Sequence, residues 1–196
     1  VTAVLQDKCS VLKSATKALW LQFQTEDGNG VNVIFKDGDD LRLDELVLQA
    51  FSLMQELWTK TSLLDKDSLS IYSVADLGGE VGMITPVANA HTLASIFIEK
   101  FEIPEGGGML EQIAVAPKII DAILAETKVF YDWIEANRGD VTEAAARKNF
   151  VHSCAGYCVA TYLLGLGDRH SSNIMLQPDG HLVHIDFGWW LGFNPR

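Results

Sequence analysis

The first part of the chain alternates short apolar runs with turn-forming residues. Residues 18–23 (ALWLQF) and 31–35 (VNVIF) are rich in the aromatic and β-branched side chains that favour strands. The acidic, glycine-containing segment between them, TEDGNG, predicts a hairpin loop. Residues 68–74 and 81–87 predict two further strands. Pro86 should end the second of these, because proline cannot donate to a β-ladder.

Helical periodicity marks one segment between these strands and most of the chain after them. Residues 41–58 place apolar side chains three and four positions apart, which predicts a helix with one buried face. After residue 91 the same periodicity returns, with a break at EGGG (105–108) and an amphipathic stretch at 116–136. Residues 141–164 predict the longest helix, which the glycines of GLG should end.

The order of these elements predicts an α+β fold with two lobes. A strand-rich lobe is followed by a short junction and then by a helical lobe, and the cleft between the lobes is the natural place for a ligand. The predicted divisions are residues 1–84, 85–87 and 88–196.

A run of polar residues then interrupts an apolar part of the chain. DRHSSN occupies residues 168–173, and Asp186 follows in HIDFG. If the hairpin between them turns at Asp179-Gly180, the favoured pair for a two-residue turn, Asn173 faces Asp186. Opposed Cβ atoms lie about 4.5–5.5 Å apart, so the two side chains could share one Mg²⁺ with phosphate oxygens. Each polar residue alone could simply cap a turn, but the whole set at this spacing favours a site.

Net charge and cysteine content exclude some classes of protein. The 196 residues carry a formal net charge of −11, which argues against nucleic-acid binding through a basic surface. Binding to anionic lipid would need a local basic patch. We find no leader-like start and no apolar run of membrane-spanning length, and so expect a cytoplasmic protein that is peripheral on membranes. Three cysteines, an odd number, argue against a disulfide framework.

Several motifs resemble one enzyme family. GDRHSSN followed by HIDFG resembles the catalytic and metal-binding loops of the phosphoinositide 3-kinase and 4-kinase superfamily. Ordinary protein kinases have His-Arg-Asp where this chain has Asp-Arg-His. SCAGYCVATYLLGLGDRH and HIDFGWWLGFNP are most similar to the phosphatidylinositol 3-kinases, the class III enzymes especially. VIFKDGDDLRLDELVLQAFSLMQELW resembles the lysine strand and following helix of the family, although Leu43 stands where glutamine is usual.

The resemblance implies a two-lobed, protein-kinase-like fold whose helical lobe is incomplete, because the chain ends in the activation loop. It implies transfer of the ATP γ-phosphoryl group to the 3-hydroxyl of a phosphatidylinositol head group, with Mg²⁺ or Mn²⁺ as cofactor. The implied partners are phosphatidylinositol in a membrane surface and a regulatory subunit or further domains of a longer chain, with no nucleic acid.

The resemblance also implies the ATP-binding residues. Lys36 would contact the phosphates, Asp44 would hold that lysine, and Ser14 would begin the phosphate-binding loop. The remaining contacts are two aromatic side chains lining the pocket and two hinge residues whose backbone reads adenine: Trp20, Tyr72, Thr85 and Val87.

The catalytic and metal-binding roles fall on the second half of the chain. Asp168 and His170 are the candidates for taking the proton of the attacking inositol hydroxyl. His184 is a further candidate, because it lies two positions before Asp186 and should share its face of a strand. Asn173 and Asp186 are assigned to the metal. Arg169 is expected to be structural, pairing with a carboxylate.

Two alternatives remain open at this point. A protein kinase of the related large Ser/Thr family would share Asp-Arg-His and Asp-Phe-Gly, although SCAGYC and FKDGDDLR favour the lipid branch. A truncated nucleotide-binding module without turnover would share the donor side of the site but not the acceptor side, and such a fragment would be inactive or much less active on lipid than a longer parent chain.

Overall fold

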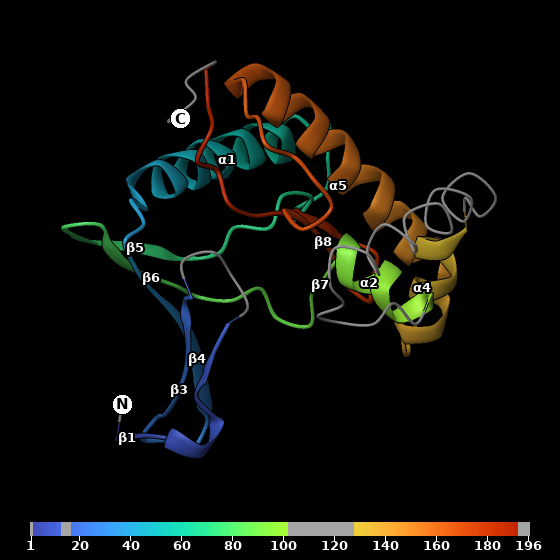
Figure 1. The fold of residues 1–196 in the computed structure, drawn as a ribbon. Helices are drawn as coiled ribbons and strands as arrows, with labels where there is room; N and C mark the ends of the chain where they lie inside the picture. The colour runs from blue at the N-terminus through green and yellow to red at the C-terminus, as the bar shows by residue number, and fades with distance from the viewer. Residues whose placement is uncertain (1, 13–16, 102–127, 192–196) are drawn as a thin grey trace, which may run out of the picture.

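The computed structural model describes residues 2–12, 17–101 and 128–191 (Figure 1). Ser14 lies outside the described residues. The predicted break at 105–108 and most of the amphipathic stretch at 116–136 lie outside them as well.

Antiparallel strands form the larger of the two sheets. The strand order is β1-β3-β4-β6-β5, with β2 also paired to β3 and the short helix η1 (Gln6–Lys8) after β1. The hairpin predicted from residues 18–35 is confirmed as β3 and β4. The strands are β1 (Ala3–Val4), β2 (Ser10–Val11), β3 (Leu19–Gln24), β4 (Gly30–Asp37), β5 (Val74–Gly78) and β6 (Val81–Ile84).

The strand predicted over residues 68–74 is wrong, because β5 begins only at Val74. In this segment, backbone N–H groups that would donate to a neighbouring strand donate instead to side chains of two helices. The Leu69 N–H donates to Gln55 Oε1 at 2.7 Å, and the Ser70 N–H donates to the Tyr157 hydroxyl at 3.2 Å. The other predicted strand is confirmed as β6, which ends before Pro86.

Helix α1 (Arg42–Lys60) confirms the helix predicted over residues 41–58. The N-cap residue is Leu41, and Asp40 Oδ1, one position earlier, accepts a hydrogen bond from the Arg42 N–H at 3.1 Å. The start of α1 lies against β6, where a Cβ on Gly82 would come within 2.5 Å of Leu41 Cδ1. Only glycine fits there, so the sheet and α1 are held close together.

The second part of the chain is mainly helical. Its small antiparallel sheet has the order β7-β8-β9. The predicted long helix is confirmed as α5, which Thr142 caps by accepting from the Ala145 N–H and which Gly165 ends at φ 57°. The elements are β7 (His91–Thr92), α2 (Leu93–Lys100), α4 (Val129–Asn137), α5 (Glu143–Leu164), β8 (Ile174–Leu176) and β9 (Leu182–His184).

Two apolar clusters hold the fold together. The first joins α1 to α5, with the Phe51 and Tyr157 rings packed edge to face at a centroid distance of 5.6 Å. Figure 1 shows these two helices close together at the end of the molecule away from β1 and β3. The second cluster joins α2, α4 and α5 to the β8–β9 hairpin. A strand-rich first part and a helical second part agree with the predicted α+β class.

None of the helices in the described ranges is long and apolar enough to cross a membrane.

Candidate active site

The β8–β9 hairpin, which carries the predicted metal ligands, turns through residues 178–180 and not through two residues. The Gln177 N–H donates to the His181 carbonyl at 2.9 Å, and Gly180 adopts φ 94°. A three-residue loop with glycine in a left-handed conformation is a common hairpin connection. A Cβ on Gly180 would lie 2.2 Å from the Ala146 carbonyl oxygen, so the turn packs directly on α5.

The longer turn shifts the register by one residue. Ile174 pairs with His184, and the Ile185 N–H donates to the Asn173 carbonyl at 3.1 Å. The predicted direct opposition of Asn173 and Asp186 is therefore wrong. Asn173 lies opposite the residue before Asp186, at the same end of the hairpin.

The oxygen atoms of both predicted metal ligands remain available. Asn173 is 7% exposed, and its Nδ2 donates to the Asp168 carbonyl at 3.0 Å. This bond fixes the amide orientation. Among the described residues, none donates a hydrogen bond to Asn173 Oδ1 or to the exposed carboxylate of Asp186.

Arg169 braces the segment that leaves β9. Its Nε donates to the Gly167 carbonyl at 2.8 Å, its Nη1 to the Ile185 carbonyl at 2.7 Å, and its Nη2 to the Asp186 carbonyl. The predicted structural role fits this geometry, but the predicted carboxylate partner is wrong. The three acceptors are backbone carbonyls.

Asp186 itself adopts φ 61°, a left-handed conformation that is uncommon outside glycine.

Lys36 lies near the end of β4 and pairs with Asp39, not with Asp44 as predicted. The Lys36 Nζ to Asp39 Oδ2 distance is 2.6 Å. Burial lowers the pKa of Lys36, but the hydrogen bond from Lys36 to Asp39 and the charges of Asp39, Asp186 and Asp44 outweigh burial and leave that pKa raised. The charge of each of these three carboxylates therefore reaches Lys36.

Asp44 has a different partner. It is 5% exposed, and its Oδ1 accepts a hydrogen bond at 3.1 Å from the N–H of Phe187, which follows Asp186 in the Asp-Phe-Gly turn. Burial raises the pKa of Asp44 to about 6, and the nearby charge of Asp186 adds to this. The hydrogen bond connects α1 directly to the Asp-Phe-Gly turn.

The two exposed catalytic candidates lie on the loop before the hairpin. Asp168 adopts φ 56°. His170 Nδ1 accepts a hydrogen bond from the Ser172 N–H at 3.2 Å, so the neutral ring carries its proton on Nε2. Accepting a substrate proton at His170 Nε2 would require this bond to be released. The carboxylate of Asp168 has no such requirement.

His184 faces the core. Its ring stacks on Tyr157 at a centroid distance of 4.3 Å, and it is only 9% exposed. Burial and the neighbouring Arg169 charge lower the pKa of His184 to about 4. The predicted shared face with Asp186 is wrong, because β9 ends at His184 and Asp186 turns outward.

The register of the larger sheet places two of the predicted ATP contacts, Trp20 and Lys36, on one face. Trp20 pairs with Ile34, which pairs in turn with Ile84, immediately before Thr85. Directly opposed residues of antiparallel strands share a face. Lys36, two positions after Ile34, shares it too.

The backbone of the predicted hinge offers an acceptor and a donor, the polarity expected of an adenine contact. The Thr85 N–H is used by the Ser73 carbonyl at 2.8 Å. Within the part of the chain that the structure describes, neither the Thr85 carbonyl nor the Val87 N–H has a hydrogen-bond partner. Tyr72 packs against the α1–α5 cluster, and burial raises the pKa of its phenol.

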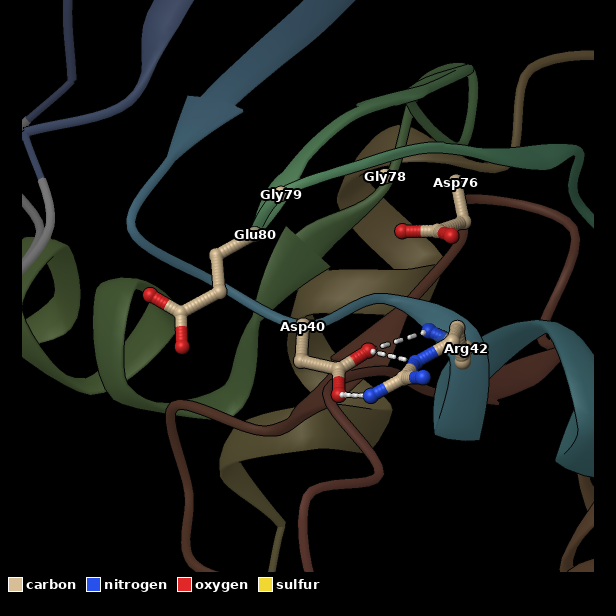
Figure 2. A pocket seen from close by; sticks show the side chains of 6 residues that line it. All are labelled: Asp40, Arg42, Asp76, Gly78, Gly79 and Glu80. Carbon is tan, nitrogen blue, oxygen red and sulfur yellow. Dashed lines mark hydrogen bonds and ion pairs between the residues drawn. The ribbon is translucent and has the colours of Figure 1, made fainter.

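Two cavities lie elsewhere. One of about 220 Å³ lies beside the β5–β6 turn, where Asp40 and Arg42 form an exposed ion pair at 2.5 Å (Figure 2). The other, of about 440 Å³, lies between α4 and α5. Neither is lined by a predicted site residue. Their lining residues are Asp40, Arg42, Asp76, Gly78, Gly79 and Glu80 for the first, and Phe130, Tyr131, Ile134, Glu135, Glu143, Ala146, Arg147, Phe150 and Val151 for the second.

Comparison with known proteins gives a consistent result. Residues 30–196 match the family model described as phosphatidylinositol 3- and 4-kinase. The chain is 41% identical over 189 residues to phosphatidylinositol 3-kinase 1 of Dictyostelium discoideum, covering 95% of this chain and 11% of that protein. It is 38% identical over 196 residues to phosphatidylinositol 3-kinase pik3 of Schizosaccharomyces pombe, covering 100% of this chain and 22% of that protein. It is also 38% identical over 195 residues to the human phosphatidylinositol 4-phosphate 3-kinase C2 domain-containing subunit beta, covering 98% of this chain and 11% of that protein.

The raised pKa of the β4 lysine, to which the aspartate of the Asp-Phe-Gly turn contributes, agrees with the kinase class that the α+β fold and the family model indicate. The family model and the relatives define it further. The chain belongs to the phosphatidylinositol 3- and 4-kinase family. It spans between about a tenth and about a fifth of the length of these relatives. The division into lobes at residues 85–87 remains a prediction.

The residues present fit the divalent cation that this family implies. The amide oxygen of Asn173 and the carboxylate of Asp186 are hard oxygen donors without competing hydrogen bonds from the described residues. Mg²⁺ and Mn²⁺ accept such donors together with water and phosphate. Within the described ranges no group of three or more His, Cys, Asp or Glu side chains could hold a metal alone, so the fit depends on phosphate oxygens.

Sequence reasoning missed Asp39 as the partner of Lys36. The available signal was the spacing Lys-Asp-Gly-Asp, because Gly38 at φ 81° turns the chain and brings Asp39 back toward the strand end. It also missed the bond from Phe187 to Asp44, which joins residues far apart in the sequence and leaves no local pattern.

Proposed function

We propose that the chain is the nucleotide- and metal-binding part of a lipid kinase that transfers the ATP γ-phosphoryl group to the 3-hydroxyl of a phosphatidylinositol head group. One observation carries the proposal. The Phe187 N–H donates to Asp44 Oδ1 at 3.1 Å, which brings the Asp-Phe-Gly turn against the first part of the chain, and the charge of Asp186 helps to raise the pKa of Lys36 there. The names of the relatives, phosphatidylinositol 3-kinases, support this reaction.

On the donor side, each residue has one task. The Thr85 carbonyl and the Val87 N–H bind adenine, and Trp20 and Tyr72 line its pocket. Lys36, oriented by Asp39 at 2.6 Å, offsets the negative charge of the phosphates. Asn173 and Asp186 hold Mg²⁺ or Mn²⁺, which supplies further charge neutralisation at the phosphates.

On the acceptor side, the inositol hydroxyl must lose its proton as it attacks. Asp168 and His170 are exposed on the loop that faces the same end of the hairpin. Asp168 is the readier acceptor, because His170 Nδ1 is already occupied by the Ser172 N–H. His184, with a pKa lowered to about 4 and its ring stacked in the core, supports the hairpin instead.

The site must meet its substrate at a membrane surface. With a net charge of −11, the chain itself offers little attraction to anionic lipid. We infer that membrane contact and regulation come from further domains or a regulatory subunit, in keeping with relatives several times longer than this chain.

The test is transfer of radiolabel from γ-labelled ATP to phosphatidylinositol vesicles in the presence of Mg²⁺. The wild-type chain should label the lipid at the 3-position of the head group, identified by chromatography of the deacylated product. Asp186→Asn should abolish labelling, whereas Lys60→Ala, at an exposed ion pair on α1, should not alter it. Label on an added peptide and none on lipid would favour a protein kinase. Binding of ATP without any transfer would favour a nucleotide-binding module.

A further inference from the structure

One peptide group in the Asp-Phe-Gly turn is held from both sides. Its carbonyl, on Asp186, accepts a hydrogen bond from Arg169 Nη2. Its N–H, on Phe187, donates to Asp44 Oδ1 at 3.1 Å. The two charged side chains come from different elements, since Arg169 lies on the loop before the hairpin and Asp44 lies in the first turn of α1.

Holding both polar groups of a peptide fixes the orientation of its plane, because the peptide bond is itself planar. That plane sets ψ of Asp186 and φ of Phe187, and so the direction in which the Asp186 side chain leaves the backbone. The constraint is needed here. Asp186 adopts φ 61°, an uncommon conformation for an L-residue, and contacts that hold the following peptide favour it.

Helix α1 and the loop that carries Arg169 also contact the Phe187 side chain. Its ring is fully buried and packs edge to face on Phe51 at a centroid distance of 5.3 Å. Phe51 lies two helical turns after Asp44, so α1 contacts both the backbone and the ring of Phe187 from one face. The Arg169 guanidinium lies over the ring at 5.2 Å from its centroid.

We propose that Asp44 and Arg169 clamp the Asp186–Phe187 peptide and thereby aim the Asp186 carboxylate at the metal. Asp44 is then a positioning residue, and what it contributes is a hydrogen-bond acceptor. A charge partner for Lys36 is already present in Asp39 at 2.6 Å. This inference rests on the proposed function only in taking Asp186 as a metal ligand.

Aspartate, asparagine and leucine have side chains of nearly equal size and shape. Comparing them at position 44 separates the effect of the charge from the effect of the hydrogen-bond acceptor. Asparagine keeps an acceptor and removes the charge. Leucine keeps the branched shape, suits a buried position and removes both. We therefore compare Asp44→Asn with Asp44→Leu, with Gln49→Ala, exposed on the same helix, as the control.

The first measurement is hydrogen exchange of the Phe187 amide in the whole chain without nucleotide. Asp44→Leu should speed this exchange about tenfold, the effect of losing one hydrogen bond. Asp44→Asn and Gln49→Ala should stay within about threefold of the wild type, a much smaller effect than loss of that bond. The amide of His184 in β9 reports on general loosening and should not change. Equal acceleration in Asp44→Asn and Asp44→Leu, or no acceleration in Asp44→Leu, would overturn the clamp.

The second measurement is Mn²⁺ affinity at saturating ADP, followed by electron paramagnetic resonance. Asp44→Leu should weaken Mn²⁺ binding by at least about tenfold, as loss of a residue that orients a ligand does, and Asp44→Asn should weaken it far less. Asp186→Asn tests the proposed function separately. If Asp186→Asn leaves Mn²⁺ affinity unchanged, the metal assignment is wrong, while the exchange data still decide whether the clamp exists. If Asp186→Asn weakens binding and Asp44→Leu does not, the clamp does not aim the ligand.

Discussion

Asp39 and Asp44 lie five positions apart, and they serve the site in opposite ways. Asp39 is about a third exposed at its side chain and forms an ion pair with Lys36. Asp44 is buried and accepts a hydrogen bond from the Phe187 backbone. A partly solvated carboxylate can supply charge without a large desolvation cost, whereas a buried one is costly to ionise. The difference indicates that Asp39 sets the charge at Lys36, and Asp44 sets the geometry at Asp186.

The largest expected effect is on Lys36, the cation that Asp39 orients. Lys36→Ala should lower the rate of phosphoryl transfer by about 100-fold or more, because it removes a fixed charge from the phosphates. It should also shrink the thermal stabilisation given by saturating Mg-ATP. Lys60→Ala, which breaks only an exposed pair with Glu56, is the control. An unchanged thermal shift in Lys36→Ala would count against the pocket.

The burial of the Asp44 carboxylate should make the free energy of unfolding depend on pH. The pKa of Asp44 rises from 3.8 to about 6 on folding, so the native state binds the proton more tightly than the unfolded state does. Stability from this group is present below pH 3.8 and is lost as the pH rises to about 6. The loss is about 3 kcal/mol, at 1.36 kcal/mol for each pKa unit.

Asp44→Asn tests this directly by urea denaturation between pH 4 and pH 7.5. The variant should be more stable than the wild type at pH 7.5, by up to about 3 kcal/mol, and the two should converge at pH 4. Asp132→Asn, an exposed position on α4, is the matched control. Parallel stability curves for wild type and Asp44→Asn would contradict a buried, costly Asp44.

A smaller effect distinguishes the two carboxylates in turnover. Asp39→Asn removes the charged partner of Lys36 and should lower kcat/KM for ATP by about tenfold, the value of one charge-assisted hydrogen bond. Asp44→Asn keeps its acceptor and should lower it by less than about threefold, since no hydrogen bond is lost. Steady-state kinetics on phosphatidylinositol vesicles give both values. A larger loss in Asp44→Asn than in Asp39→Asn would reverse the assignment.

Local patterns predicted the elements of this fold that depend on local interactions. The β3–β4 hairpin, α1 and α5 follow from alternation, periodicity and capping residues such as Thr142 and Gly165. Residues 68–74 have the composition of a strand, yet Gln55 and Tyr157 bond their backbone from two helices. No local pattern encodes such long-range partners.

For the candidate site, the sequence named the residues, and the structure revised several of their expected contacts. The motifs assigned Lys36, Asn173 and Asp186 to one site, and the predicted hairpin register was wrong by one residue, because the turn packs on α5 through Gly180 and takes three residues. Lys36 meets Asp39 because Gly38 adopts a left-handed conformation, and Asp44 meets Phe187 through a hydrogen bond between segments far apart in the sequence. Neither contact can be identified without the folded structure.

The most direct test of the account is a calorimetric titration of the chain with ATP, with and without Mg²⁺. The account predicts that the wild type binds ATP more tightly with Mg²⁺, that Asp186→Asn loses this gain while keeping its Mg²⁺-free affinity, and that Lys36→Ala weakens binding in both conditions. The account would be contradicted if Asp186→Asn kept the full gain from Mg²⁺, because the metal would then lie elsewhere.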